Sequence, residues 1–207
     1  LEQAALSGGC IEQILPLYTG LRLGELCALK WSDVDFGART LRVQRSVQRL
    51  SSPQSAGKTA LQIGTPKSDS SVRELPLPAF LLALLREKRT KAPAERFIFP
   101  GKGGAAMDPR TMQNRYKALL KRVGVPYRNF HALRHTYATR CIEQGIDAKS
   151  VSELLGHSDV RTTLRLYVHA SMDYKSKAVE AIGFLNSADI YAPVVYNPTL
   201  PAFPVCG

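Results

Sequence analysis

Apolar side chains recur at helical spacing along most of the chain. This spacing predicts two helices near the start, over 8–18 and 22–30, with a break between them at Thr19 and Gly20. Asp108 followed by Pro109 is typical of a helix start, because the aspartate caps free amides and proline has none to cap. The remaining predicted helices cover 78–91, 109–123, 129–144 and 147–155, then one from 158 or 159 through Tyr167 and one from 173 to about 185.

A shorter part of the chain has the alternating pattern of β-strands. Residues 34–36 and 41–50 flank a turn at Gly37, which predicts an antiparallel pair, and 72–77 form a further short strand. The polar residues 51–58 predict a loop or the tip of a hairpin. We therefore expect a fold that is mainly α with a small antiparallel β-sheet.

Size and hydropathy place bounds on the class of protein. The 207 residues are 44% hydrophobic, which is enough for one large domain with its own core. Charges interrupt the longest apolar stretches well short of a membrane span, and we expect no signal peptide. The cysteines form no CxxC pair, so we expect free thiols in a reducing cytoplasm rather than disulfides or a metal site; they are Cys10, Cys27, Cys141 and Cys206.

Charge is distributed unevenly along the chain. The formal net charge is +11, and residues 37–73 hold seven basic residues and one acid, while 109–140 hold eight basic residues and no acid. A solvated surface usually mixes both signs, so one-sided blocks favour a polyanion partner, with nucleic acid as the leading candidate. The alternative is a basic surface without a binding role.

Residues with catalytic potential stand at breaks between the predicted helices. Arg22 follows a glycine break, and His131 and Arg134 are three positions apart, so they share one helix face. His157 follows a predicted helix stop and precedes Tyr167 by ten residues. Taken singly, each has a plainer explanation, since most helix arginines are solvated and a helical tyrosine is commonly a core residue.

Three sequence blocks together carry a family resemblance. They are TGLRLGEL at 19–26, continuing to LKWSD at 29–33; HALRHT at 131–136; and LLGH at 154–157, continuing through Thr162 and Thr163 to Tyr167. A weaker fourth block, TPKS at 65–68 with RELPL at 73–77, looks like the strand-turn segment that bears the family's lysine. In this order and spacing, the blocks resemble the tyrosine recombinases, or phage integrases, over about residues 10–180.

This resemblance implies the catalytic-domain fold of a tyrosine recombinase and the activity of a site-specific DNA recombinase or integrase. A phosphodiester gains negative charge as it is cleaved, and the guanidiniums of Arg22 and Arg134 would bind its oxygens. Tyr167 would attack phosphorus and form a covalent 3′-phosphotyrosine, so that rejoining needs no ATP. His131 would be the general base or proton acceptor, His157 would hydrogen-bond the phosphate, and Lys67 would protonate the leaving 5′ oxygen.

The resemblance implies supporting roles for further residues. Glu25 would be structural and would hold the helix that presents Arg22. Lys58 and Lys102 are alternatives to Lys67, because they also lie in predicted loops. Phosphate contacts with double-stranded DNA are predicted for six arginines, which are Arg42, Arg45, Arg73, Arg110, Arg115 and Arg128. No metal, cofactor or nucleotide is expected.

We expect a catalytic domain over 1–186 and a C-terminal tail over 187–207. The family normally has DNA-binding modules before this domain, so the chain is interpreted as a truncated recombinase that forms a homo-oligomer, dimer to tetramer, on DNA. Residues 45–65 are predicted to be an inserted basic hairpin that touches DNA or a neighbouring protomer. The tail would pack onto an adjacent protomer or be a frayed end. A bacterial, phage or mobile-element origin and a cytoplasmic location are expected.

Three other functions are considered. His131 and His135 have a spacing that can bind zinc, but Ala132 stands where a metalloprotease needs glutamate and no third ligand completes a site. A DNA-binding module without catalysis, and a type IB-like nicking-closing topoisomerase, remain as alternatives. The glycines around Lys102 lack the spacing of a P-loop, which argues against nucleotide binding.

Overall fold

The computed structural model describes residues 2–51, 59–65, 71–167, 176 and 179. The chain divides into two compact units, 1–170 and 171–207, and the architecture below is that of the first. The predicted helix over 173–185 and the predicted tail over 187–207 therefore lie almost entirely outside the described residues. None of the helices in the described ranges is long and apolar enough to cross a membrane.

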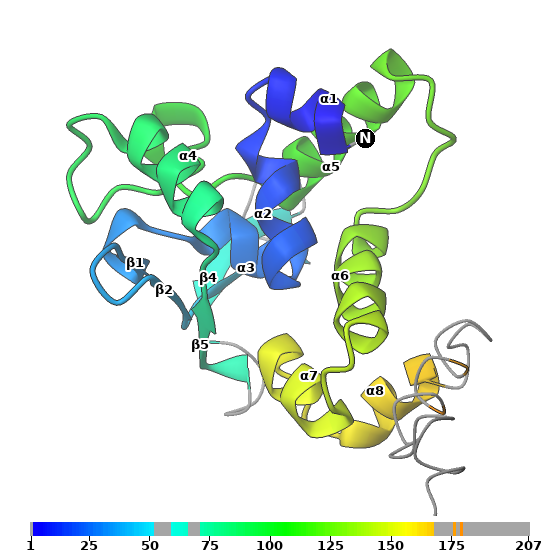
Figure 1. Ribbon diagram of the computed structural model, residues 1–207. Coiled ribbons are helices and arrows are strands. Elements are labelled where there is room, and N and C mark those ends of the chain that lie inside the picture. Colours follow the sequence, from blue (N-terminus) through cyan, green and yellow to red (C-terminus); the bar gives the residue numbers. More distant parts are fainter. Residues whose placement is uncertain (1, 52–58, 66–70, 168–175, 177–178, 180–207) are drawn as a thin grey trace, which may run out of the picture. The chain divides into compact units, whose positions relative to one another are not determined.

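Helices make up most of the first unit, as the apolar spacing predicts (Figure 1). The short helix α1 (Glu2–Ser7) is not among the predicted elements. The predicted helices are found within a few residues of their expected ends as α2 (Ile11–Thr19), α3 (Leu23–Ala28), α4 (Ala79–Arg89), α5 (Pro109–Arg122), α6 (His131–Glu143), α7 (Ala148–Leu155) and α8 (Val160–Tyr167). Short 3-10 turns follow α3 at Trp31–Asp33 and occur at Lys102–Gly104.

Side-chain caps define where several helices begin. Asp108 accepts a hydrogen bond from the Arg110 amide at 2.9 Å, at the start of α5. The Asp147 carboxylate accepts from two amides of α7, and Asp159 accepts from the Arg161 amide at the start of α8. These bonds satisfy amides that have no partner within their own helix, which is why the sequence signal for each start is reliable.

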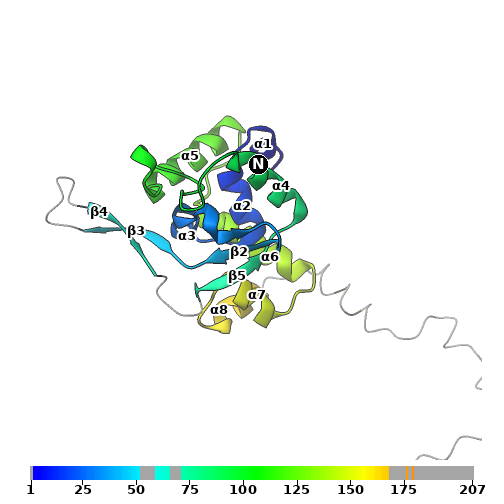
Figure 2. The same ribbon diagram turned by 90° about the vertical axis from the view of Figure 1, so that its left-hand side faces the viewer.

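The strands form two small antiparallel sheets. β2 (Thr40–Val43) lies between β1 (Val34–Asp35) and β5 (Arg73–Pro76), with Leu41 opposite both Val34 and Leu75. Among the described strands, β3 (Ser46–Ser51) pairs with β4 (Thr59–Gly64) alone. The hairpin predicted over 45–65 is therefore confirmed as a β-ladder, and Figure 2 shows it extending away from the helices.

The prediction of one continuous strand over 41–50 is wrong, because the chain leaves the first sheet after Val43. The Asp33 carboxylate stabilises this break: it accepts from Gln44 Nε2 at 2.8 Å and from Arg45 Nη2 at 2.6 Å. Asp33 is buried, and these bonds, with a third from the Lys30 amide at 2.7 Å, offset its lost hydration. The two residues between the strands are thereby held out of either ladder.

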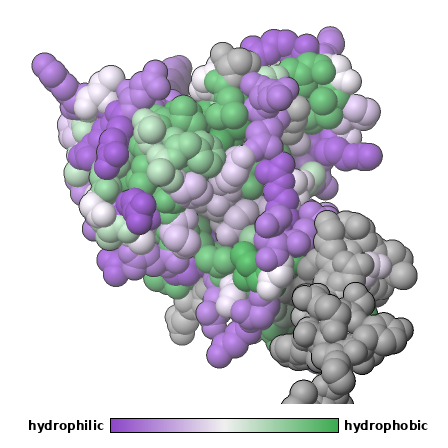
Figure 3. All heavy atoms as spheres, viewed as in Figure 1, coloured by the Kyte–Doolittle hydropathy of each residue, from purple (hydrophilic) through white to green (hydrophobic). Residues whose placement is uncertain are grey.

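The main hydrophobic core lies between the helices and the first sheet. It joins Leu15 and Leu26 to Leu41 of β2, Leu75 of β5 and Leu81 of α4, all fully or almost fully buried. Each buried leucine contributes about 2 kcal/mol relative to an exposed one. On the face drawn in Figure 3, hydrophilic residues cover much of the surface, with apolar patches between them.

A second, smaller core attaches α7 to α6. Ala138 and Cys141 of α6 pack with Val151 and Leu155 of α7. α6 also packs against α2, and α7 against β5 and α8. This packing brings the C-terminal end of α7 next to the turn between α2 and α3, although these segments are more than a hundred residues apart in sequence.

Candidate active site

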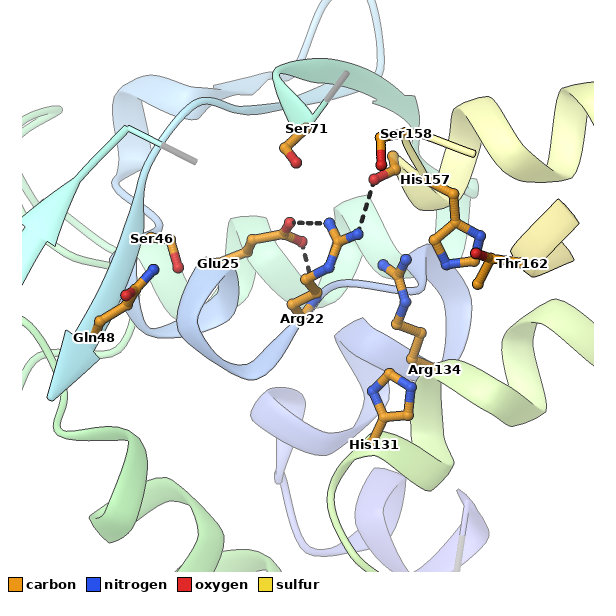
Figure 4. A pocket seen from close by; sticks show the side chains of 11 residues that line it. Arg22, Glu25, Ser46, Gln48, Ser71, His131, Arg134, His157, Ser158 and Thr162 are labelled. Atoms are coloured by element: carbon orange, nitrogen blue, oxygen red, sulfur yellow. Dashed lines mark hydrogen bonds and ion pairs between the residues drawn. The ribbon is translucent and has the colours of Figure 1, made fainter. Parts of the chain in front are cut away.

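A pocket of about 580 Å³ lies where α3, α6, the α7–α8 turn and β3 meet. Four of the predicted site residues line it, namely Arg22, His131, Arg134 and His157. Figure 4 shows the two guanidinium groups side by side in this pocket, with Glu25 beside Arg22 and the two imidazoles near Arg134. The fold therefore gathers side chains from three of the sequence blocks around one space.

The turn between α2 and α3 positions Arg22. Gly20 ends α2 with φ +64°, and a Cβ atom there would lie 2.6 Å from the Tyr137 ring, so both conformation and space favour glycine. Arg22 then caps α3: its amide donates to Glu25 Oε2 and its Nη1 donates to Glu25 Oε1, each at 2.8 Å. Glu25 holds Arg22 as expected, and 37% of the arginine side chain stays exposed to the pocket.

Arg134 is held more deeply, with only 3% of its surface exposed. Its Nη1 donates to the Gly20 carbonyl and its Nη2 to the Leu155 carbonyl, both at 2.7 Å. Arg22 Nη2 donates to the Gly156 carbonyl at 2.8 Å. Each arginine is thus fixed by carbonyls at a helix C-terminus, which lack partners within the helix and carry partial negative charge.

The pocket has a strongly positive character. Glu25 is the single acidic side chain among its described lining residues, and it already pairs with arginine. Burial and the nearby charge of Arg22 lower the pKa of Arg134. A guanidinium nevertheless stays protonated at neutral pH, so the two adjacent cations favour an anion that can bind both.

The two histidines of the pocket are suited to accept protons or hydrogen-bond as neutral rings. Burial, followed by the charge of Arg134, lowers the pKa of His131. The same causes lower the pKa of His157 to about 4. His157 Nδ1 lies 2.8 Å from the hydroxyl of Thr163, which is fully buried. This contact fixes the ring and leaves its other nitrogen for a ligand.

Depression of the His157 pKa predicts that stability falls with falling pH. The unfolded chain binds a proton near pH 6.5 and the folded site near pH 4, so stability is present above pH 6.5 and is lost as the pH falls towards 4. Between pH 7 and pH 5 this group accounts for at most about 2 kcal/mol. Thermal melts at both pH values should show a smaller difference for His157→Gln than for the wild type. An equal difference in both proteins would contradict the prediction, and His135→Gln, which alters an exposed ring, is the matched control.

Two predicted catalytic residues are described less fully. Tyr167 is the last residue of α8, but its side chain lies outside the described residues, and so does Lys67. Of the alternative lysines, Lys58 also lies outside them, whereas Lys102 is exposed in a 3-10 turn and does not line the pocket. The tyrosine and lysine roles therefore stay predictions.

The predicted contact between Arg73 and DNA phosphates is corrected, because the Arg73 side chain is only 7% exposed and cannot lie along a DNA backbone. It pairs with Glu25 instead, since the buried carboxylate needs cationic partners. Arg45 is also engaged, with Asp33, and 26% of its side chain is exposed. Arg42 lines a hollow together with Asp33, Asp35 and Glu74, which is an unfavourable electrostatic setting for phosphate.

The other three predicted DNA contacts are exposed arginines. Arg110 lies in the first turn of α5 and Arg128 just before α6. Arg115 is half exposed, with Glu12 at 3.9 Å. These three remain available for a polyanion, because none is enclosed by the core.

The described residues contain no group of three histidine, cysteine, aspartate or glutamate side chains able to hold a metal ion. Cys10, Cys27 and Cys141 are free thiols, as expected, and burial raises the pKa of Cys27 to about 12. Cys206 lies outside the described residues.

Sequence reasoning missed the backbone part of the site. The carbonyls of Gly20, Leu155 and Gly156 bind the two arginines, and Ser46 and Gln48 of β3 line the pocket. Every residue has a backbone carbonyl, so the residue type does not indicate which carbonyls bind a side chain. The αL helix stops at the two glycines could have indicated exposed carbonyls, but not which side chains bind them.

The chain that forms this pocket matches a known protein family. The phage integrase family matches residues 10–173, which is most of the chain. The chain belongs to the phage integrase family. The residues that match the phage integrase family include all the described residues that line the pocket. They also include Tyr167.

Two relatives of this phage integrase domain are named as tyrosine recombinases. A tyrosine recombinase XerC-like protein of Caldanaerobacter subterraneus subsp. tengcongensis is 40% identical over 190 residues, covering 83% of this chain and 48% of that protein. Tyrosine recombinase XerC of Xanthomonas axonopodis pv. citri is 35% identical, covering 79% and 47%. The chain thus spans about half the length of these relatives.

Solved structures support the same fold. The Tn1549 transposon integrase, solved in complex with circular intermediate DNA, has a TM-score of 0.68 at 26% identity, covering 84% of this chain and 59% of that one. The XerA recombinase has a TM-score of 0.63 at 26% identity, covering 87% and 59%. The predicted fold class, a mainly α tyrosine recombinase catalytic domain with small antiparallel sheets, is confirmed.

Proposed function

We propose that this chain is the catalytic domain of a site-specific DNA recombinase, which cleaves and rejoins strands through a 3′-phosphotyrosine at Tyr167. The observation that carries the proposal is the convergence of Arg22 and Arg134 on one pocket, each fixed by helix-end carbonyls. Family membership and the tyrosine recombinase names of the relatives support it.

The first step is recognition of one backbone phosphate. Two planar guanidiniums can each donate two hydrogen bonds to its non-bridging oxygens, and guanidiniums are charged at neutral pH. Because Arg134 is anchored by two carbonyls before DNA arrives, little reorganisation is needed as charge develops on the phosphate. Neutral His157 would add a hydrogen bond to the same phosphate.

The second step exchanges one phosphodiester for another. The Tyr167 oxygen attacks phosphorus while the bond from phosphorus to the 5′ oxygen breaks. The phenol proton passes to His131, whose lowered pKa keeps it neutral and able to accept, and the leaving 5′ oxygen takes a proton from Lys67. A 3′-phosphotyrosine and a 5′-hydroxyl result, and the reverse reaction with a new 5′-hydroxyl rejoins DNA without an energy source.

Double-stranded DNA is the proposed partner. The Tn1549 integrase neighbour was solved with DNA, and the basic block over 109–140 leaves Arg110, Arg115 and Arg128 exposed on this chain. We place the exposed arginines along the phosphate backbone, and the β3–β4 hairpin, with Gln48 at the pocket, near the DNA or a neighbouring protomer. A homo-oligomer on DNA, a mobile-element origin and a bacterial cytoplasmic location complete the proposal.

Phosphate contacts by these arginines predict a defined salt dependence. Removing one arginine–phosphate interaction should reduce the slope of log affinity against log salt by about 0.9. Arg110→Gln with Arg128→Gln should therefore lower the slope by roughly 2, measured by fluorescence anisotropy on duplex DNA at several salt concentrations. Arg86→Gln, on α4 away from the basic block, is the control that should leave the slope unchanged. An unaltered slope in the double variant would show that neither arginine contacts a DNA phosphate.

Covalent trapping tests the proposed chemistry directly. A pool of nicked suicide duplexes, randomised around the cleavage position, loses a short oligonucleotide on cleavage and leaves the adduct trapped. We expect a denaturant-resistant adduct whose recovered DNA shares one sequence, and whose yield does not change in chelator. Failure to form any adduct across the whole pool would overturn the proposal.

A further inference from the structure

Arg73 is the buried link between three segments around the pocket. It is the first residue of β5, and its side chain is only 7% exposed. Its Nη1 and Nη2 donate to Glu25 Oε1 and Oε2 at 3.1 and 3.0 Å. Its Nε donates to the Leu154 carbonyl at 2.7 Å, and Nη1 also donates to the Ser71 carbonyl at 3.0 Å. One guanidinium therefore joins β5 to α3 and to the end of α7.

These contacts place Arg73 behind Arg22 rather than at the phosphate. Arg73 is not among the residues that line the pocket, whereas Arg22 and Glu25 are. Glu25 lies between them: its carboxylate accepts from Arg22 on one side and from Arg73 on the other. The shared carboxylate therefore connects Arg73 directly to Arg22.

The charges around Glu25 depend on Arg73, the second arginine that pairs with this carboxylate. The side chain of Glu25 is 2% exposed, so its negative charge is compensated by neighbours rather than by water. Arg22, Arg73 and Arg134 carry three positive charges against this one carboxylate. Two net positive charges remain with Arg73 present. Without Arg73, Glu25 would draw Arg22 into a simple ion pair, and one net charge would remain.

We propose that Arg73 is a positioning residue that neutralises Glu25, so that Arg22 keeps its positive charge available for the phosphate. The inference rests on the proposed recombinase function. Its contact with the Leu154 carbonyl additionally fixes the end of α7, where the Leu155 and Gly156 carbonyls hold Arg134 and Arg22. Arg73 thus acts on both guanidiniums without touching substrate.

A set of charge variants separates this role from plain structural support. Arg73→Met removes the charge, Arg73→Lys keeps it with fewer hydrogen bonds, and Arg73→Met with Glu25→Gln restores the wild-type net charge. The probe is the nicked duplex recovered from the randomised pool. Single-turnover adduct formation is measured over a range of DNA concentrations, and circular dichroism melts identify the fraction folded at the assay temperature. Arg140→Met, which breaks the Arg140–Glu2 ion pair outside this pocket, is the matched control.

For folded Arg73→Met we expect a loss of about 100-fold in the maximal cleavage rate, with half-saturating DNA within about threefold of wild type. Arg73→Lys should stay within about tenfold of the wild-type rate, and the double variant should be at least about tenfold faster than Arg73→Met. The control should stay within about twofold. A Met variant within about threefold of wild type, a Lys variant no better than Met, or a double variant no faster than Met overturns the inference.

Two further results have a defined meaning: an unfolded Arg73→Met variant, and a wild type that forms no adduct. If Arg73→Met is unfolded, the variant that combines Arg73→Met with Glu25→Gln decides. A cleavage rate within about tenfold of wild type supports the inference. A cleavage rate as low as that of Arg22→Met, measured in the same assay, overturns it. If the wild type forms no adduct, the proposed function fails. If the wild type forms adduct and its rate is insensitive to Arg73, only the role of Arg73 fails.

Discussion

Replacing Tyr167 with phenylalanine is expected to abolish covalent DNA adducts while leaving DNA binding intact. The substitution removes only the oxygen of the proposed nucleophile, so we expect a loss of at least about 10⁴-fold. Adduct yield on the nicked duplex, resolved on a denaturing gel, measures the chemistry. Fluorescence anisotropy with the same duplex measures binding, which should change by less than about twofold.

Tyr116→Phe supplies the matched control for loss of a phenol. Tyr116 is buried in α5 against Phe130, away from the pocket, so its variant should form adduct at the wild-type rate. An adduct that persists in Tyr167→Phe would mean that another nucleophile acts. Loss of adduct together with loss of binding would instead show that position 167 supports the fold, and would leave the nucleophile unassigned.

Replacing Arg134 with lysine is expected to damage both catalysis and stability. Lysine keeps the charge but cannot donate to the Gly20 and Leu155 carbonyls while also facing a phosphate. Loss of one preorganised donor set should slow cleavage by about 10³-fold. At least one buried carbonyl would be left unpaired, which costs about 1–3 kcal/mol of folding free energy.

Single-turnover adduct formation and urea unfolding measure these two effects separately. Arg140→Lys, on the same helix but 44% exposed and paired with Glu2, should alter neither. If Arg134→Lys cleaved at the wild-type rate, bidentate binding of the phosphate by this side chain would be ruled out. If stability alone were lost, Arg134 would be a structural link between α2, α6 and α7.

The positions of the helices and of most site residues were predictable from local signals. Capping aspartates and glycine stops mark where the helices begin and end, since these residues satisfy or expose backbone groups in a manner that depends on a few neighbours only. The family blocks then identified Arg22, His131, Arg134 and His157, which the structure gathers in one pocket.

Errors arose where a hydrogen-bonding partner lay outside the local sequence pattern. Residues 41–50 have a strand pattern throughout, yet Asp33 binds Gln44 and Arg45 and divides them between two sheets. Arg73 has the sequence context of a surface arginine next to a strand. Its buried position depends on Glu25, 48 residues earlier in the sequence, whose carboxylate accepts hydrogen bonds from Arg73 Nη1 and Nη2.

The sequence by itself determined the helical class, the caps, the one-sided basic blocks and the residue types available for phosphate chemistry, because these follow from local propensity and composition. Only the tertiary structure decided which arginines reach the pocket and which are locked behind it. The physical reason is that burial of a charge is set by its three-dimensional neighbours: the same guanidinium binds a carbonyl, a carboxylate or a phosphate according to what folding brings next to it.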